Sequence, residues 1–174
     1  STSDIYSEEA GANYRKLRRV LESFHGRKSP GAVDVVWSYL GDKDRFLRHA
    51  ARVAIESQEV AGWKDRAVNE TNPEAGLSAL LALARVGGRE TQNELLGALK
   101  RFPFDALTPE QKLTKLRVIE LSFIRQGKPN SQFIKLATEK LGHLYPSDSY
   151  EMNRELCQLL VFLEAPDVVE KTFT

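Results

Sequence analysis

Three arginines spaced along one segment are the residues best suited to binding a charged partner. Arg45, Arg48 and Arg52 recur at intervals of three and four residues, which places them on one face of a helix. Further basic residues cluster at 15–19 and 27–28. Such a pattern could bind phosphate or nucleic acid, but acidic residues accompany both clusters. We therefore treat the three arginines as a candidate interaction surface and expect nucleic acid to be an unlikely partner.

Histidine and cysteine supply no recognisable reactive group. His25, His49 and His143 fall on three different predicted helices, whereas metal ligands are usually close in sequence or share one face. Cys157 lies on an apolar helix, where we expect it to be buried as a small hydrophobic side chain. No residue is predicted to be catalytic, to bind a cofactor or to ligate a metal, so we expect no cofactor and no enzymatic activity in this segment.

Composition narrows the class of protein. The 174 residues carry 25 Lys and Arg against 24 Asp and Glu, and this net charge of +1 gives no general reason to expect nucleic acid or an anionic membrane as a partner. A single cysteine excludes an internal disulfide and a Cys-rich zinc site. No apolar run approaches the ~20 residues that span a bilayer. No small-molecule ligand is evident from the sequence either.

The elements that must position these residues are all predicted to be helices. Cap and stop signals are dense: Ser29-Pro30, Asn72-Pro73 and Thr108-Pro109 each pair an N-cap residue with a first-turn proline, and Gln111 completes a capping box. The apolar spacing predicts helices at about 7–24, 30–40, 42–56, 60–69, 73–86, 90–101, 109–126, 131–144 and 150–164, with a further helix beginning at Pro166.

Short connections and broad apolar faces favour stacked helix pairs. Links of a few residues force neighbouring helices to lie antiparallel. In the helix at 109–126, Leu116, Ile119 and Phe123 share one face, while Val118 and Ile124 extend it, so the helix must be covered on several sides. Cap signals recur roughly every 30 to 41 residues, a spacing close to that of helical repeats. The sequence therefore predicts one all-α domain over 1–174, an α-solenoid of about five helix pairs; an irregular helical bundle is the alternative.

One segment resembles a known repeat family. Residues 42–56, DKDRFLRHAARVAIE, are similar to the first helix of a HEAT repeat, with Asp44, Leu47, Arg48 and Ala51 at the matching positions. PEAGLSALLALARVGG and APDVVEK resemble other helix starts of the HEAT-like, armadillo-type class. The resemblance implies an α-solenoid fold and carries no function of its own.

A narrower resemblance concerns the parent protein. FHGR, DRFLRHAARVAIE and NRELCQLLVFLEAPDVVEKT are similar to the helical-repeat region of large secreted dehydrogenase-like proteins of planctomycete type, in which a β-propeller and a c-type cytochrome domain flank that region. The resemblance implies a spacer or docking module of an exported, possibly periplasmic, redox protein; without it the compartment would be cytoplasmic. Residue 1 is Ser and the last stretch reads as a helix barely begun, so we expect a fragment of a longer chain.

We accordingly expect a non-enzymatic protein-interaction or scaffold module. Its partner would be a protein, or a neighbouring domain of the same chain. The alternatives are a nucleic-acid-binding HEAT-like domain and a HEAT-like enzyme of the DNA glycosylase or bilin lyase type, because the fold does not forbid catalysis.

Overall fold

A computed structural model describes residues 2–165, and within that range every regular element is helical. The all-α prediction is confirmed for these residues. The chain divides into two compact units, residues 1–87 and 88–174, which are described separately below. The prediction of a single domain stays a prediction, and the helix expected from Pro166 lies outside the described residues.

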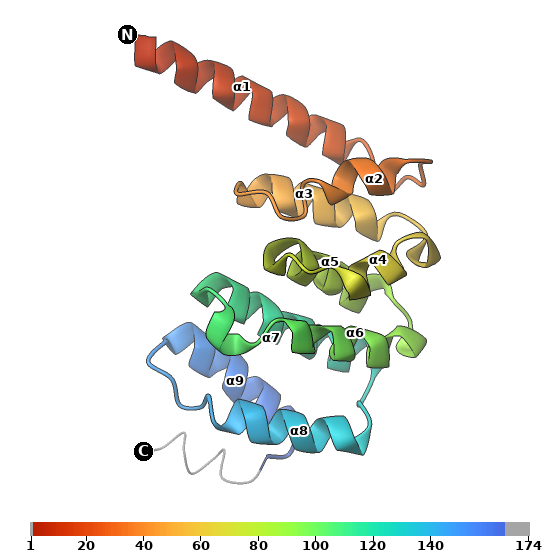
Figure 1. The fold of residues 1–174 in the computed structure, drawn as a ribbon, viewed down its shortest axis with the longest axis vertical. Coiled ribbons are helices and arrows are strands. Elements are labelled where there is room, and N and C mark those ends of the chain that lie inside the picture. Colours follow the sequence, from red (N-terminus) through yellow and green to blue (C-terminus); the bar gives the residue numbers. More distant parts are fainter. Residues whose placement is uncertain (1, 166–174) are drawn as a thin grey trace. The chain divides into compact units, whose positions relative to one another are not determined.

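Unit 1 contains five α-helices in two rows. They are α1 (Thr2–Glu22), α2 (Ala32–Trp37), α3 (Arg45–Glu56), α4 (Lys64–Asn69) and α5 (Pro73–Val86), with the 3-10 helix η1 (Val60–Gly62) before α4. The helix α3 lies between α1 and α5 and also packs on α2, while α4 packs on α5 (Figure 1). Alanines make this close approach feasible: Ala50, Ala51 and Ala54 of α3 are at most 2% exposed.

Polar side chains fasten the connections of unit 1. The buried Gln58, just after α3, accepts a hydrogen bond from the backbone N–H of Ser29 at 2.9 Å and donates to the carbonyl of Arg27 at 2.8 Å. Glu56 forms ion pairs with Arg52 on its own helix and with Arg85 of α5, the latter at 2.9 Å. These contacts set the α1–α2 connection against the end of α3 and join α3 to α5.

The described part of unit 2, residues 88–165, contains four α-helices. They are α6 (Gln92–Ala98), α7 (Pro109–Gln126), α8 (Ser131–Gly142) and α9 (Tyr150–Phe162), with the 3-10 helices η2 (Arg89–Thr91), η3 (Leu99–Arg101) and η4 (Phe104–Ala106). The helix α7 packs on α6 and α9, and α9 also packs on α8 (Figure 1). Leu116 and Leu156 are fully buried, and Leu141 is 2% exposed, so the hydrophobic core of the unit runs along these helices.

Buried polar groups join the start of unit 2 to the end of α7. The Gln92 amide donates to the carbonyl of Gly127 at 2.7 Å, and the Gln126 amide donates to the Thr91 hydroxyl at 3.1 Å. The Ser122 hydroxyl donates to Gln126 at 2.9 Å. Because each of these polar side chains has a partner, the network fixes η2 against α7 without leaving a buried group unsatisfied.

The predicted helix starts at 73, 109, 131 and 150 are confirmed, whereas the other five differ from prediction; α1 begins earlier, at Thr2, and α3 begins later, because Asp44 rather than Asp42 is its N-cap residue. Thr108 with Gln111, Asn72, Asn130 and Ser149 each cap the helix that follows. The second helix begins later than predicted, because Gly31 is its N-cap residue in a left-handed conformation (φ 75°) and Ser29 forms a turn instead. The helix expected at 60–69 begins as the 3-10 helix η1 before α4, and the helix expected at 90–101 is α-helical only over α6, with the 3-10 helices η2 and η3 at its two ends.

The apolar face of α7 is narrower than predicted. Ile124 was expected to extend the covered face of α7, but its side chain is 64% exposed. Among the helices of residues 2–165, none is both long and apolar enough to cross a membrane.

Candidate functional site

The predicted arginine surface is occupied by contacts within unit 1. Arg48 pairs with Glu74 at 3.0 Å and donates to the carbonyl of Asp42 at 2.7 Å, and Arg52 pairs with Glu56. The side chains of Arg48 and Arg52 are only 14% and 13% exposed. Arg45 lies over the Phe46 ring, 4.8 Å from its centroid. A partner would have to break these ion pairs to reach two of the three arginines, so the stripe is a poor site for external anions.

His25 and His49 lie close enough in unit 1 for their charges to interact, whereas His143 and Cys157 belong to unit 2. His25 contacts the carbonyl of Ala50 at 2.9 Å, and burial together with the neighbouring Arg52 lowers the pKa of His49. His143 is in unit 2, at the C-cap of α8. Cys157 was expected to be buried, but it is half-exposed, because the buried face of α9 centres on Leu156, Leu159 and Leu160 and Cys157 lies at its edge.

Three large aromatic residues, Trp37, Trp63 and Phe104, differ in how far they are buried. Trp37 and Trp63 of unit 1 are 5% and 1% exposed, as expected for packing residues. The Trp37 indole donates to Glu70 at 2.8 Å, and the Arg66 guanidinium lies 4.3 Å from a Trp37 ring centroid. Phe104 of unit 2 differs, because it is half-exposed and lines a cavity.

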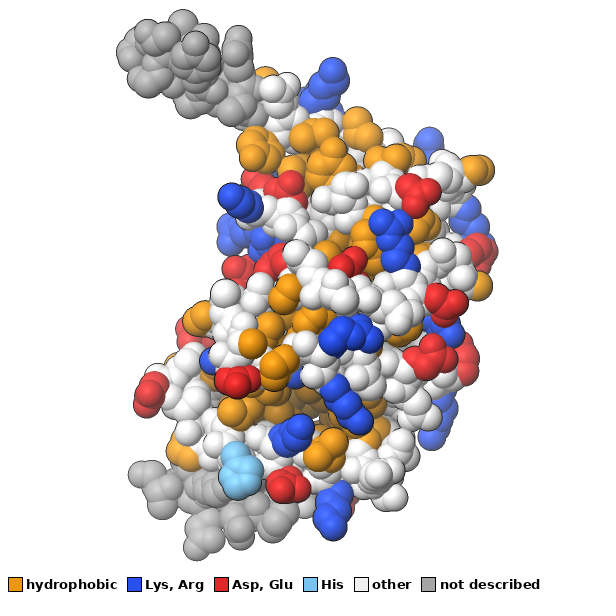
Figure 2. Space-filling view, viewed as in Figure 1, with side chains coloured by type: hydrophobic (Ala, Val, Ile, Leu, Met, Phe, Trp, Pro, Cys, Tyr) orange, Lys and Arg blue, Asp and Glu red, His pale blue; other side chains and the backbone are white. Residues whose placement is uncertain are grey.

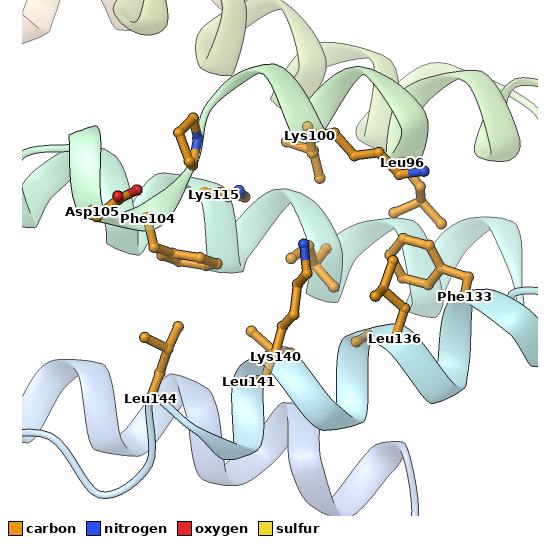
Figure 3. Close-up of a pocket in the computed structure, with 14 residues that line it drawn as sticks. Leu96, Lys100, Phe104, Asp105, Lys115, Phe133, Leu136, Lys140, Leu141 and Leu144 are labelled. Atoms are coloured by element: carbon orange, nitrogen blue, oxygen red, sulfur yellow. The ribbon is translucent and has the colours of Figure 1, made fainter.

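This cavity, which we call the lysine groove, lies between α6, α7 and α8 and has a volume of about 350 Å³. Its walls are mostly apolar. They include Leu96 and Leu99 from one side, Ile119 from α7, and Phe133, Leu136 and Leu141 from α8, with Phe104 and Leu144 at one end (Figure 3). Phe104, Phe133, Leu136 and Leu144 all remain half-exposed in the folded chain. A cavity of this size and composition is typical of a binding site.

Lys115 is the unusual residue of the groove. It is 7% exposed, and its Nζ donates a 2.6 Å hydrogen bond to the carbonyl of Phe102 and lies 4.3 Å from the centroid of the Phe104 ring. The carbonyl of Phe102 follows η3, so the amine caps the end of that 3-10 helix. Burial, and after it the charge of Lys140, lowers the pKa of Lys115 to about 8, while Asp105 opposes the shift.

Positive charge predominates at the groove. Lys100 from η3 and Lys140 from α8 are both exposed, and Asp105 is the one carboxylate among the lining residues. Figure 3 shows Lys140 extending from α8 toward the opposite wall. Figure 2 shows hydrophobic side chains exposed between Lys and Arg side chains over α6 and α8. The groove therefore combines an apolar floor with a cationic edge.

A second hollow of about 210 Å³ adjoins the lysine groove. The two share Leu96, Lys100, Phe133 and Leu136, and the second is more polar. Its other lining residues include Asn93 and Asn130, whose side chains are hydrogen-bonded to each other at 3.2 Å. Together the two hollows form a surface longer than the apolar groove alone, with amides at one end.

The sequence contains one feature that could have indicated this site, a lysine on the apolar face of a predicted helix. Lys115 shares a face of α7 with Val118, Ile119 and Ser122, all of which are buried, so a lysine interrupts an otherwise covered face. A buried lysine is rare without a partner, which makes such a position worth noting. The groove itself depends on how α6 and α8 flank α7, and that arrangement is not legible from spacing.

Comparison with protein-family models, with curated proteins and with solved structures finds no match.

Proposed function

We propose that this chain is a non-enzymatic protein-interaction module, and that its lysine groove receives an apolar segment of a partner protein that also carries carboxylates. The observation that carries the proposal is the groove itself, in which half-exposed Phe104, Phe133, Leu136 and Leu144 surround a volume of about 350 Å³. Covering such side chains removes apolar surface from water, which is the main driving force of association.

The shape of the surface supports a polypeptide partner. The adjoining hollow extends the apolar groove and offers the amides of Asn93, Asn130 and Gln132. An extended or helical segment can place an apolar side chain in the groove and its backbone or polar side chains over these amides.

Charge supports an acidic partner. Lys100 and Lys140 border the groove, and Asp105 is the single opposing carboxylate among the lining residues. Carboxylates beside the apolar anchor would complement this edge, which chiefly increases the association rate and the specificity.

We also propose that the helices of both units belong to one HEAT-like α-solenoid. The packing of successive helices on one another within each unit and the resemblance of residues 42–56 to a HEAT helix support this architecture. Distances measured by spin labels on Tyr14→Cys and on the native Cys157 test it: a solenoid keeps these positions far apart, whereas a globule whose first and last hairpins meet would contradict it.

The parent protein is a separate part of the proposal. The resemblance to secreted dehydrogenase-like proteins would make a neighbouring domain the partner of the groove. The domain order of the full-length gene tests this: β-propeller repeats and a haem-attachment motif would support it, and their absence would remove it.

Selection of displayed random peptides on the intact chain tests the groove. We expect enriched peptides that combine large apolar residues with Asp or Glu. Leu136→Asp, on the groove wall, should weaken their binding by roughly tenfold or more, since truncating a central anchor typically costs over 1 kcal/mol.

Two matched controls separate the groove from general surface effects. Ile124→Asp changes an exposed apolar residue of the same unit that does not line the groove, and it should leave binding unchanged. Lys140→Glu should weaken binding more than Lys135→Glu, an exposed lysine of the same helix that does not line the groove. The proposal would be refuted if the two variants of each pair lost the same peptide affinity, or if no peptides were enriched.

A further inference from the structure

One amine of the chain differs from its other described lysines in its surroundings. The Nζ of Lys115 lies on the wall of an apolar groove, held by the carbonyl of Phe102 at 2.6 Å and by the face of the Phe104 ring at 4.3 Å. Among the described residues, no carboxylate lies within 4 Å of this Nζ. The amine is thus buried beside a space large enough for a small molecule, and no carboxylate of the described residues forms an ion pair with it.

These surroundings favour the neutral amine. The apolar walls penalise the charged form, and the nearby Lys140 of α8 adds to the penalty, whereas Asp105 of η4 is the acidic group that opposes it. With a pKa of about 8, the neutral fraction near pH 7.5 is far larger than that of a lysine at its ordinary value of 10.5. A desolvated lysine next to a second cation is the arrangement by which proteins make an amine nucleophilic.

We propose that the lysine groove is a capture site for apolar aldehydes, which form a reversible imine with Lys115. The groove would hold the alkyl or aryl chain against Phe104, Leu136 and Leu144, and so bring the carbonyl carbon to Nζ. The chemical class of the ligand follows from the apolar walls and the amine together. The walls favour a ligand with an apolar body, and the amine requires an electrophilic carbonyl group.

The step balances without any further reagent. The nitrogen lone pair attacks the carbonyl carbon, the C–N bond forms, and the π electrons move to the oxygen. A proton passes from nitrogen to that oxygen, giving a carbinolamine. A proton from solvent then converts the hydroxyl into water, which leaves with the C–O bond electrons while the nitrogen lone pair forms the C=N bond. One neutral amine, one aldehyde and one proton thus yield one protonated imine and one water.

The contacts that hold the amine also suit the product. A protonated imine keeps one N–H and a positive charge. The N–H can still donate to the carbonyl of Phe102, and the charge can still face the Phe104 ring, since both groups interact with a cation. Capture therefore retains both contacts of the free side chain.

Reductive trapping on the intact chain tests the proposal. The protein is incubated with hexanal and sodium cyanoborohydride near pH 7.5, and the alkylation of each lysine is measured by peptide mass spectrometry. Lys115 should be modified roughly tenfold faster than the exposed Lys135, because its neutral fraction is larger. Modification of Lys115 at or below the rate of Lys135 would overturn the proposal.

Labelling with formaldehyde distinguishes the contribution of the groove from the reactivity of the amine itself. This aldehyde has no apolar body, so the preference for Lys115 over Lys135 should be smaller with formaldehyde than with hexanal. Leu136→Ala, which removes apolar wall without adding charge, should lower the hexanal labelling of Lys115 and leave its formaldehyde labelling unchanged, whereas Ile124→Ala should change neither. An equal preference with both aldehydes would reject capture by the groove. These readouts do not depend on whether the groove binds a protein.

Discussion

At the scale of single residues, Lys115 shows both what the sequence reveals and what it conceals. Its position on a covered face of α7 is legible from its spacing to Val118 and Ser122. Its contacts cannot be predicted from the sequence, because the carbonyl of Phe102 and the ring of Phe104 come from a segment between η3 and α7 that lacks a periodic pattern. The chemistry of a side chain is set by such neighbours, and irregular segments supply them here.

The first prediction concerns the pH dependence of stability at Lys115. Its folded pKa of about 8 lies below its ordinary value of 10.5, so between these values the unfolded chain binds more protons at this residue. The free energy of unfolding should therefore rise with pH across that window, and the wild type should gain stability relative to Lys115→Met.

Urea unfolding followed by circular dichroism from pH 7 to 10.5 measures this difference. Lys112→Met, one turn earlier on α7, is the matched control for loss of any lysine. If the free energies of unfolding of both variants depend on pH in the same way, the pH dependence of the wild type does not arise from the buried amine of Lys115.

At the scale of elements, helix starts are the features that the sequence specifies best. The Thr108–Gln111 capping box and the Asn72, Asn130 and Ser149 caps are local interactions, complete within four residues, and so spacing alone predicts them. The start of α2 was wrong because Gly31 takes a left-handed conformation, which the Ser29-Pro30 cap signal does not reveal. The lysine groove is beyond such reasoning, since it depends on which helices become neighbours.

The second prediction tests the capping box. Thr108→Ala removes the acceptor for the backbone N–H of Gln111 and should destabilise unit 2 by about 1 kcal/mol. Thr114→Ala, on the same helix, removes a hydroxyl that bonds only to the carbonyl of Glu110, and its cost should be smaller. Thermal unfolding of both variants measures the difference; equal costs would mean that the cap contributes nothing specific.

The third prediction concerns Glu70, which joins α2 to the α4–α5 connection. Burial tends to raise the pKa of its carboxyl, but hydrogen bonds from the N–H of Asn72, the Trp37 indole and the N–H of Thr71 outweigh it and lower the pKa below 4.5. The stabilisation is present above that ordinary value and is lost as pH falls through the folded pKa.

Acid titration of unfolding checks this expectation for unit 1. The stability advantage of the wild type over Glu70→Gln should shrink as the pH falls below about 4.5. Asp65→Asn, at an 84% exposed side chain, serves as the control. An advantage that stays constant on acidification would contradict the role given to the Glu70 carboxylate.

At the scale of the whole molecule, positive and negative charges are nearly balanced, and several of the arginines are ion-paired. The net charge is +1, and the arginines at 48, 52 and 85 are each in ion pairs within unit 1. The near-zero net charge follows from the composition. The ion pair between Glu56 of α3 and Arg85 of α5 could not be predicted from the sequence, because these residues are 29 positions apart.

The fourth prediction follows from this pairing. Neutralising phosphates requires basic side chains that can release counterions, and the arginine stripe is already engaged. Duplex DNA should therefore show no salt-sensitive retention by the chain in a filter-binding assay at low salt. Retention that falls steeply as salt is raised, and that is lost in Arg45→Ala, would contradict this expectation.

The placement of the two tryptophans has a practical consequence. Both Trp37 and Trp63 are buried in unit 1, and the chain has no other tryptophan. Selectively excited indole emission therefore reports the melting of the first 87 residues alone, whereas far-ultraviolet dichroism reports helix loss along the entire chain. Two superimposable melting curves would show that both halves unfold as one cooperative unit, and displaced curves would give the stability of each half without cutting the chain.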